Sequence, residues 1–587
     1  MRLQISRTKN AESFYVVKSV YEKGKRTNII FEKLGTLQEV QAKAGEMEAH
    51  EWAKAYVEKL NSEIAEGREE EVTIRLSPQK KIETEGKVKY NVGQLYLKKL
   101  YHQMRWHEIT KEIERSSKAE IDLDSVVQML LYTRILYPSS KRSSLELSER
   151  FIQPTKAELH QVYRALDILG KNMDQVQEGI YKRTASYCER NTDVLYYDCT
   201  NFFFEMEEED DFRKYGKSKE HRPNPIVQMG MFIDGDGIPL AVTLFPGNEN
   251  EQGSLKPLEQ KILKDFELSQ FIVCTDAGLA CEATRRFNST ESRRYVVTQS
   301  LKTLPQPVME WALESKGWKK EGDPLPNKYD LREIDEEKDK DAIFYKEQVV
   351  RIGGLDQRLI VTFSVKAKEY QRSVRERQIN RAVKTVDSHP EKMTEYQQTD
   401  YRRLIQMSFL TKEGEVSTKR HLAIDTEAIS KEEKFDGYYG ICTNLPRKSE
   451  KHPEGKTTLD IIRINHMRWQ IEDCFRDLKS HFKSRPVYLS KENRIKAHFL
   501  LCCLSLILFK YLEKAVHNAS SATFSSEQLL ATLRDLEMLH VKGFGYIPAF
   551  SSSPLLSSLQ TAFSLSLDTQ ITTDNAMKKN LKSCSSP

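Results

Sequence analysis

The stretch from Asn465 to Lys479 is the feature that most constrains how this chain can fold. When it is placed on an α-helix at about 100° per residue, four polar residues share a stripe roughly 60° wide. They are Asn465, Arg468, Glu472 and Lys479. Apolar residues collect on another face, so the helix has a side to bury. A carboxylate held between two cations suits a metal ligand beside groups that contact phosphate oxygens. The simpler alternative is an ordinary amphipathic helix with an ion pair between Arg468 and Glu472.

Length and composition indicate a folded protein of several domains. A chain of 587 residues is too long for one hydrophobic core. Its hydrophobic content of 39% and charged content of 30% are typical of soluble proteins. The formal net charge of +5 is too small to indicate a polyanionic partner, so local clusters of charge have to decide that question.

The cysteines and the apolar runs predict a cytoplasmic protein without membrane spans. The nine cysteines form no Cys-x-x-Cys pair, so we expect reduced thiols and neither a disulfide framework nor a zinc site. The first residues contain no apolar h-region, so no signal peptide is expected. The longest apolar run, 499–509, is too short to cross a bilayer and predicts a buried helix.

Changes in periodicity divide the chain into six segments. The first contains a predicted β-hairpin with Gly24 at its turn, and the Ser-rich end of the chain predicts a flexible tail. The segments are a small β-rich unit plus helix (1–70), a mainly helical region that is a candidate for DNA binding (71–190), an α/β region (191–300), a β-rich region (301–455), a second α/β part (456–515), and a helical segment with a flexible tail (516–587).

Two predicted strands carry acidic residues. Asp198 lies in the middle of the apolar run 194–204, where an unpaired carboxylate is costly unless it is paired or binds a metal. Asp276 ends the apolar run that begins at Phe271, and ligand chemistry in α/β sheets gathers at the carboxyl ends of strands. The structural alternatives are a turn cap near Asn201 for the first and a helix N-cap for the second.

Together with Glu472, these aspartates suit a site for two metal ions. Two strand-borne aspartates and a helix-borne glutamate can hold two divalent cations about 4 Å apart, as phosphoryl transfer requires. Carboxylate oxygens favour Mg²⁺, with Mn²⁺ as the alternative, and the lack of clustered Cys and His argues against zinc.

At these residues the chain resembles the DDE transposases of bacterial insertion sequences, in the group named after insertion sequence four. That group carries Tyr-x2-Arg-x3-Glu-x6-Lys on a helix. This chain has Arg468, Glu472 and Lys479 at the same spacings, with Asn465 in place of the tyrosine. The contexts Tyr-Tyr-Asp198-Cys-Thr-Asn and Thr-Asp276-Ala-Gly are also similar, and the resemblance covers roughly residues 190–510.

The resemblance implies an α/β fold with a ribonuclease-H-like catalytic core and a β-rich insertion before the glutamate. It implies an Mg²⁺-dependent endonuclease that cuts transposon ends and joins the freed 3′-OH to target DNA during DNA recombination. Asp198, Asp276 and Glu472 would be catalytic metal ligands, and Arg468 and Lys479 would contact DNA phosphates. The phosphate contact of the missing tyrosine would be absent, although Asn465 could donate a hydrogen bond in its place. The partners would be double-stranded transposon ends and target DNA, bound by a dimer in the cytoplasm, associated with the nucleoid.

Two basic clusters are candidates for DNA binding, and each has a simpler reading as a solvated surface. The first is predicted to be a phosphate-binding loop and contains Arg213, Lys214, Lys217, Lys219 and Arg222. The second spans 366–384, where charges surround a predicted helix. Trp469 could stack on an unpaired base, but we expect it to close the core.

Two other functions fit the same residues. A ribonuclease-H-like nuclease would cut DNA without joining it. A catalytically retired transposase would only bind DNA, although the presence of all three acids weighs against this. Paired terminal repeats flanking the gene would distinguish a transposase from both.

Overall fold

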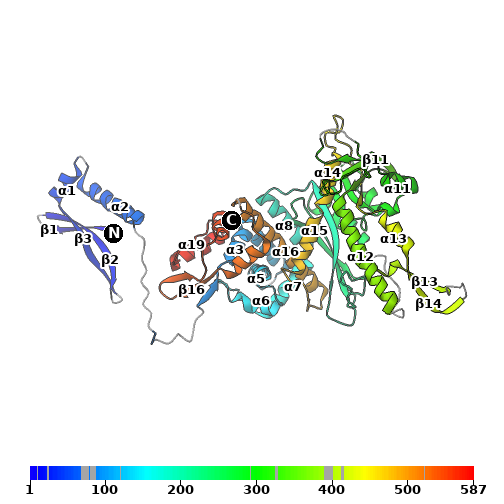
Figure 1. Cartoon of the computed structure of the whole chain (residues 1–587). Helices are drawn as coiled ribbons and strands as arrows, with labels where there is room; N and C mark the ends of the chain where they lie inside the picture. The colour runs from blue at the N-terminus through cyan, green and yellow to red at the C-terminus, as the bar shows by residue number, and fades with distance from the viewer. Residues whose placement is uncertain are drawn as a thin grey trace. The chain divides into compact units, whose positions relative to one another are not determined.

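The computed structural model describes residues 1–587 except 9–10, 23–24, 46, 68–77, 80–87, 119, 291, 324–327, 389–400, 411–415, 521 and 587. The chain divides into two compact units, Met1–Gly86 and Lys87–Pro587 (Figure 1). Each unit has a hydrophobic core of its own.

The first unit is a small antiparallel sheet with two helices. Its strands pair in the order β1-β2-β3 within the described residues, which confirms the predicted hairpin. The turn with Gly24 lies outside the described residues. Phe14, Val16 and Leu34 of the sheet pack with apolar residues of the helices. The elements are β1 (Arg2–Thr8), β2 (Ala11–Glu22), β3 (Lys25–Thr36), α1 (Leu37–Ala44) and α2 (Ala49–Gly67).

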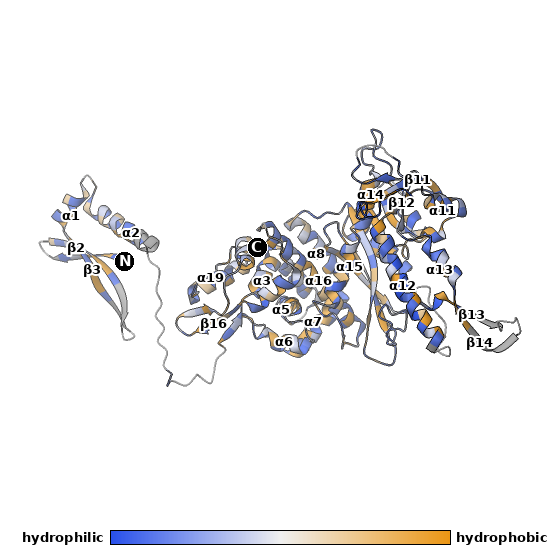
Figure 2. Cartoon of the chain, viewed as in Figure 1, coloured by the Kyte–Doolittle hydropathy of each residue, from blue (hydrophilic) through white to orange (hydrophobic). Residues whose placement is uncertain are grey.

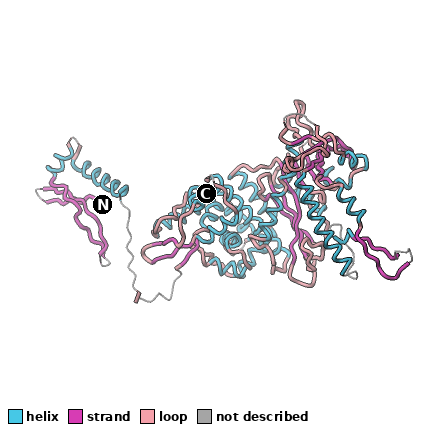
Figure 3. Tube along the Cα trace, viewed as in Figure 1, coloured by secondary structure: helices cyan, strands magenta, loops and turns pink. Residues whose placement is uncertain are grey.

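The second unit is organised around one long buried helix, α16 (Glu492–Asn518). It packs against the helices α3, α5, α7, α8 and α18 and against strand β7. Figure 3 shows these helices in cyan beside the strands of the sheet in magenta. By length and composition α16 could cross a membrane, but 89% of its most apolar window is buried inside the protein. The prediction of a buried helix is therefore confirmed.

The remaining helices around α16 agree with the predicted helical region. The pattern predicts a helix at 173–187, which is the observed span of α8. The other helices are α3 (Gln94–Gln103), α4 (Trp106–Ser117), α5 (Leu123–Leu136), α6 (Lys141–Ser148), α7 (Leu159–Lys171), α8 (Met173–Tyr187) and α17 (Ser526–Asp535).

The C-terminal segment corrects one prediction. Instead of a flexible tail, the chain forms α18 (Pro554–Phe563) and α19 (Asp574–Cys584). Met577 and Cys584 of α19 are buried in the large core, which holds this Ser-rich segment in place. A small antiparallel sheet, in the order β17-β16-β4 within the described residues, lies in the same unit. Its strands are β4 (Lys89–Asn91), β16 (Glu537–Val541) and β17 (Gly545–Pro548).

A mixed sheet of nine strands in the described part of the chain forms the α/β region, in the order β10-β11-β12-β15-β9-β8-β5-β6-β7. Strands β5, β6 and β7 form an antiparallel meander, while β5, β8 and β9 run parallel. Helix α9 covers one face and α16 lies on the other side of the meander. The elements are β5 (Val194–Phe203), β6 (Ile226–Ile233), β7 (Pro239–Pro246), α9 (Leu255–Asp265), β8 (Phe271–Thr275), α10 (Glu282–Phe287) and β9 (Arg293–Gln299).

The β-rich segment 301–455 continues this sheet beyond β9. Its strands β15, β12, β11 and β10 follow one another by antiparallel pairing, and a long charged helix, α12, comes after β12. Figure 2 shows that hydrophilic and hydrophobic residues both occur along α12. The elements are α11 (Gln306–Leu313), β10 (Lys319–Lys320), β11 (Phe344–Ile352), β12 (Leu355–Phe363), α12 (Val365–Ser388), β13 (Ile405–Leu410), β14 (Val416–Ile424), α13 (Thr426–Glu433) and β15 (Tyr438–Thr443).

The stretch from Asn465 to Lys479 is divided between two helices, so the prediction of one continuous helix is wrong. Helix α14 (Thr458–His466) ends before Met467, and α15 (Trp469–Lys479) begins after Arg468. At the break, the N–H of Arg468 bonds to the carbonyl of Asn465, a tighter turn than in an α-helix. The break lets α14 pack on β8 and β9 while α15 packs on β5 and α16.

Candidate active site

The first two predicted acids are carried by adjacent parallel strands: Asp198 lies within β5, and Asp276 directly follows the last residue of β8. The register of β5 and β8 pairs Tyr196 with Cys274, two residues before Asp198 and Asp276 respectively. Because side chains alternate along a strand, Asp198 projects from the same face as Tyr196. Asp276 lies one residue beyond β8, and its charge acts on Asp198. Tyr196 and Cys274 both belong to the large core, on the face against which α14 and α15 pack.

Electrostatics also bring the two aspartates together. Burial raises the pKa of Asp198 to about 6, and the neighbouring carboxylate of Asp276 raises it further. The cations of Lys219 and Arg468 oppose this shift. Asp198 is therefore a half-buried carboxyl group between one like charge and two opposite charges.

Each aspartate uses one oxygen to hold the local backbone. Oδ1 of Asp198 accepts the N–H of Cys199 at 2.8 Å, and Oδ1 of Asp276 accepts the N–H of Leu279 at 3.0 Å. Asp276 thus stabilises the turn after β8, but the N-cap of α10 is Cys281. Within the described parts of the chain, Oδ2 of neither aspartate accepts a hydrogen bond, so both are available to a ligand.

Arg468, at the break between α14 and α15, links Glu472 to the aspartates. Its Nη2 lies 3.8 Å from Oε1 of Glu472, and its charge lowers the pKa of Asp198. Glu472 is on the first turn of α15, with its side chain 64% exposed. In the described ranges, no three His, Cys, Asp or Glu side chains form a group that could hold a metal ion. Glu472 is therefore joined to the aspartate pair through Arg468 and not by direct clustering.

Lys479 lies at the other end of α15, in a partly buried ion-pair network. Its Nζ is 3.5 Å from Oε1 of Glu220 and 5.5 Å from the centre of the Phe202 ring. Burial lowers the pKa of Lys479 to about 8, and the cation of Lys219 lowers it further. Arg485 pairs with the other oxygen of Glu220. The carboxylate of Glu220 thus forms ion pairs with both Lys479 and Arg485.

Lys219 is a member of the basic loop whose charge lowers the pKa of Asp198. It donates a hydrogen bond to the carbonyl of Cys199, and its Nζ lies 3.5 Å from Oε1 of Glu251. The charge of Lys219 lowers the pKa of both Asp198 and Lys479. Lys219 therefore lies between the two groups of predicted site residues.

The other cations of this loop fall into two sets. Arg213 pairs with Asp210, and Lys214 lies 3.3 Å from Glu209, so local acids already neutralise them. Lys217 and Arg222 are exposed, and the guanidinium of Arg222 lies 4.4 Å from the centre of the Phe203 ring. Only the second set is free to meet an external anion.

The second basic cluster is neutralised in a similar way over part of its length. Lys366 lies 3.3 Å from Asp341, and Lys368 lies 2.7 Å from Glu336. Arg375 is buried and pairs with Asp436 through two hydrogen bonds. These ion pairs favour the structural reading for the first half of α12.

Two other predicted residues differ in their surroundings. Asn465, at the tyrosine position, accepts a hydrogen bond from Oγ1 of Thr298 on β9 at 3.1 Å. Trp469 is 46% exposed, so the expectation that it closes the core is wrong. The break after Met467 starts α15 at Trp469, and the apolar side of α15 that packs inward begins with Ile471.

Sequence reasoning missed Glu220, Arg485 and Glu251. The one available signal is that Glu220 is the only acid in the basic run 216–222, so it can pair with cations around it. Arg485 and Glu251 lie far from the loop in sequence, so only the fold brings them together.

The donor set fits a hard divalent cation. Asp198 and Asp276 repel each other and each keeps one carboxylate oxygen without a hydrogen bond among the described residues. A cation that prefers carboxylate oxygens, such as Mg²⁺, would relieve this repulsion.

Comparisons with known proteins bear on the second half of the site. Residues 356–508 match the family model described as the transposase DDE domain, a range that contains Arg468, Glu472 and Lys479. No curated protein matches the chain. A cryo-EM structure of the piggyBac transposase synaptic complex with hairpin DNA aligns with 84% of this chain and 85% of its own, at 9% identity. Its TM-score of 0.35 is too low to carry an argument. The match to the transposase DDE domain supports the resemblance of this chain to DDE transposases.

Proposed function

We propose that this protein is a DDE transposase of the insertion-sequence-four type, which cuts DNA at transposon ends and joins the 3′-OH to target DNA. One observation carries this proposal. Asp198 and Asp276 lie side by side on parallel strands, and Arg468 interacts with both Asp198 and Glu472. The order and direction of the strands fit the ribonuclease-H-like core that the resemblance implies, with an antiparallel meander continued by parallel strands.

In this proposal Asp198, Asp276 and Glu472 hold Mg²⁺, or Mn²⁺ in its place. When bound, such cations activate the attacking oxygen and stabilise the leaving oxygen of a phosphodiester. The aspartates belong to a sheet whose register fixes their separation. Glu472 belongs to an exposed helix turn, where its carboxylate can exchange Arg468 for another cation without unpacking the core.

The cations on the same side bind and orient the DNA backbone. Lys479 is partly buried and packs against Phe202. This packing restricts its ammonium group to one position, where it can bind a phosphate. Arg468 and Lys219 flank the aspartates, and Lys217 and Arg222 are exposed nearby in sequence. Phosphates bound here would lie beside the carboxylates, as cleavage requires.

The first test removes the charge of Glu472. Glu472→Gln should fold and bind end-containing DNA as the wild type does, because the side chain is exposed. It should lose at least a hundredfold of the Mg²⁺-dependent cleavage rate, since a neutral amide is a poor metal ligand. The control is Glu527→Gln, at another exposed carboxylate. Cleavage by Glu472→Gln at the wild-type rate would contradict the assignment.

The second test distinguishes joining from cutting. Water and a DNA 3′-OH are activated in the same way, so the carboxylates alone do not choose between them. We expect precut transposon-end duplexes, full-length protein and Mg²⁺ to give strand-transfer products in a supercoiled target. We also expect two protein copies in the active complex, because two ends must be held together. Nicking without joined products, with paired ends present, would indicate a nuclease, and binding without nicking would indicate a retired transposase.

A further inference from the structure

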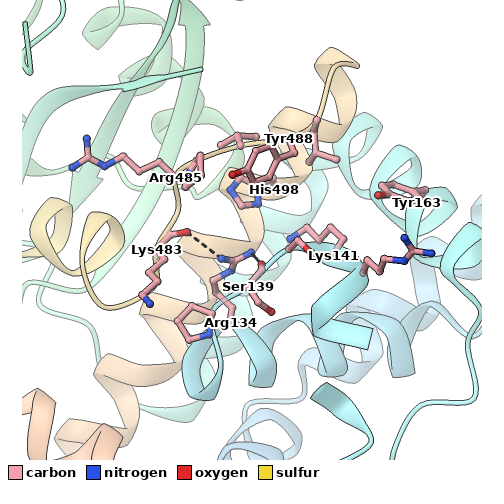
Figure 4. A pocket seen from close by; sticks show the side chains of 14 residues that line it. Arg134, Ser139, Lys141, Tyr163, Lys483, Arg485, Tyr488 and His498 are labelled. Carbon is pink, nitrogen blue, oxygen red and sulfur yellow. Dashed lines mark hydrogen bonds between the residues drawn. The ribbon is translucent and has the colours of Figure 1, made fainter. Parts of the chain in front are cut away.

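A second basic site lies outside the carboxylate site, at the junction of α5, α6 and the segment 483–489. A cavity of about 270 Å³ is present here. Its walls include the end of α5, the first residues of α6 and His498 of α16 (Figure 4). Neither the sequence motifs nor the proposed reaction accounts for this cavity.

Three basic side chains meet at the cavity without a carboxylate. Lys141, Arg134 and His498 are each at most 6% exposed. The charges of Lys141 and Arg134 both lower the pKa of His498, and that of Arg134 lowers the pKa of Lys141, so the groups are close neighbours. The thiol of Cys502 also acts on Lys141 and raises its pKa, so it opposes the effect of Arg134.

These basic groups differ in how their polar atoms are satisfied. Arg134 donates to the carbonyls of Phe482, Lys483 and Ser139. Nε2 of His498 bonds to the carbonyl of Ser484 at 2.9 Å. Lys141, in contrast, makes no hydrogen bond or ion pair with any described residue. In Figure 4 its ammonium group points toward the middle of the cavity, beside Arg134 and below His498.

A buried ammonium group without a partner is unfavourable unless a ligand satisfies it. Burial, together with Arg134, lowers the pKa of Lys141 to about 7, which reflects this cost. A bound anion would supply the missing negative charge. Because the site lacks carboxylates among its described neighbours, it is selective for anions over cations.

The backbone at the same place adds a second attraction for anions. Helix α6 begins at Lys141, with Ser140 as its N-cap. Oγ of Ser140 accepts the N–H of Ser143 at 3.1 Å, which leaves the N–H groups of Lys141 and Arg142 for a ligand. The first N–H groups of a helix lack partners within the helix and carry a partial positive charge, a combination that binds phosphate in many proteins. Lys141 and the helix N-terminus therefore converge on one small cavity.

The residues at the opening of the cavity indicate which kind of molecule would carry the anion. Tyr488, also part of the cavity wall, is 74% exposed and offers an aromatic face for a sugar or a base. The guanidinium of Arg485 points away from the cavity, toward Glu220, which also pairs with Lys479. The segment 483–489 thus connects this cavity to the cations of the candidate active site.

We propose that this cavity binds a phosphate group of a nucleotide, held by Nζ of Lys141 and the N-terminal backbone of α6. The phosphate belongs either to a DNA strand or to a free nucleotide. The first source rests on the proposed function, and the second does not.

The test uses full-length protein and inorganic phosphate as the probe, with chloride at matched ionic strength. In a calorimetric titration, Lys141→Met should lose at least tenfold in phosphate affinity. Met keeps the length and apolar stem of the side chain while removing its charge. The control is Lys156→Met, at an exposed lysine of the same unit, which should bind phosphate as the wild type does.

A second measurement needs no variant, in case Lys141→Met fails to fold. Amine-specific labelling of the wild type, read by mass spectrometry, should slow at Lys141 when phosphate is added and stay unchanged at Lys156. Equal phosphate affinity in wild type and Lys141→Met, or no protection of Lys141 by phosphate, would overturn the proposal.

Duplex DNA then separates the two sources. If DNA displaces phosphate and protects Lys141, the bound phosphate belongs to a DNA strand. If phosphate and DNA bind without competition, the bound phosphate does not belong to a DNA strand, and the site is independent of DNA binding. The titration does not involve Asp198, Asp276 or Glu472, so its failure and the failure of the cleavage assays are distinguishable.

Discussion

Asp198 should destabilise the folded protein at neutral pH, and Asp198→Asn should reverse this effect. Burial is the largest cause of the raised pKa of Asp198, which lies at about 6 instead of 3.8. Lys219, the N–H of Cys199 and Arg468 only partly compensate for burial and for the charge of Asp276. A carboxylate that the proposed function assigns to catalysis would thus be kept at a cost in stability.

The size and the sign of the effect follow from the shift in pKa. A shift of roughly two pH units corresponds to about 3 kcal/mol in the free energy of unfolding. Well below pH 3.8 the carboxyl group is protonated in both the folded and the unfolded chain, so there is no cost, and near pH 4 the cost is still small. Between pH 4 and pH 6 the unfolded chain releases the proton first and the folded protein loses stability. Above pH 6 the cost is complete, so the gain from Asp198→Asn should reach its plateau there.

The assay is urea unfolding without divalent ions at pH values from 4 to 8, followed by tryptophan fluorescence. Asp198→Asn should match the wild type near pH 4 and unfold at higher urea near pH 8. Asp193→Asn, at an exposed aspartate just before β5, is the matched control and should show no such pH dependence. Mg²⁺ should stabilise the wild type at pH 8 more than it stabilises Asp198→Asn. A variant that is less stable than the wild type at pH 8, or equally changed at pH 4 and pH 8, would refute this reasoning.

Two further predictions concern cations with different roles. The pKa of Lys479 is lowered to about 8, so its positive charge is present below pH 8 and is lost above it. Affinity for end-containing DNA should therefore fall roughly tenfold between pH 7 and pH 9, and Lys479→Arg should remove this dependence in a fluorescence anisotropy titration. Arg375→Met should lower the free energy of unfolding by about 3 kcal/mol, because it leaves Asp436 without its buried partner. Arg377→Met, at an exposed position two residues later on α12, should change it by less than about 0.5 kcal/mol, and equal losses at both positions would contradict the structural role of Arg375.

The sequence predicted best those helices and strands whose bounds follow from the hydrophobic pattern within the segment itself. The apolar run 226–233 is the observed span of β6, and the pattern at 173–187 is the observed span of α8. The positions of Asp198 and Asp276 on their strands follow from the same local signal. Strands β5 and β8 are neighbours through a long-range pairing. Local periodicity does not predict this pairing, and only the shared metal-binding chemistry of Asp198 and Asp276 indicated it.

The errors come from contacts between distant parts of the chain. Residues 574–584 lie in the Ser-rich end of the chain and are mostly polar, yet Met577 and Cys584 reach the large core and order α19. The break at Met467 arises because α14 and α15 pack on different strands, which no periodicity within the stretch reveals. The acids that neutralise α12 belong to other segments, so a basic run in sequence overstates the positive charge available to DNA.

In the proposed function, Arg468 would allow three carboxylates that do not cluster directly to hold the same metal ions. Asp198 and Asp276 are fixed by strand register and repel each other, while Glu472 stands on an exposed turn of α15. Arg468 sits at the break, where its position depends on both α14 and α15, and it neutralises part of the charge of Asp198 and of Glu472. A divalent cation would compete with Arg468 for the same two carboxylates. The guanidinium would then be released toward the phosphates, so metal binding and DNA binding would each favour the other.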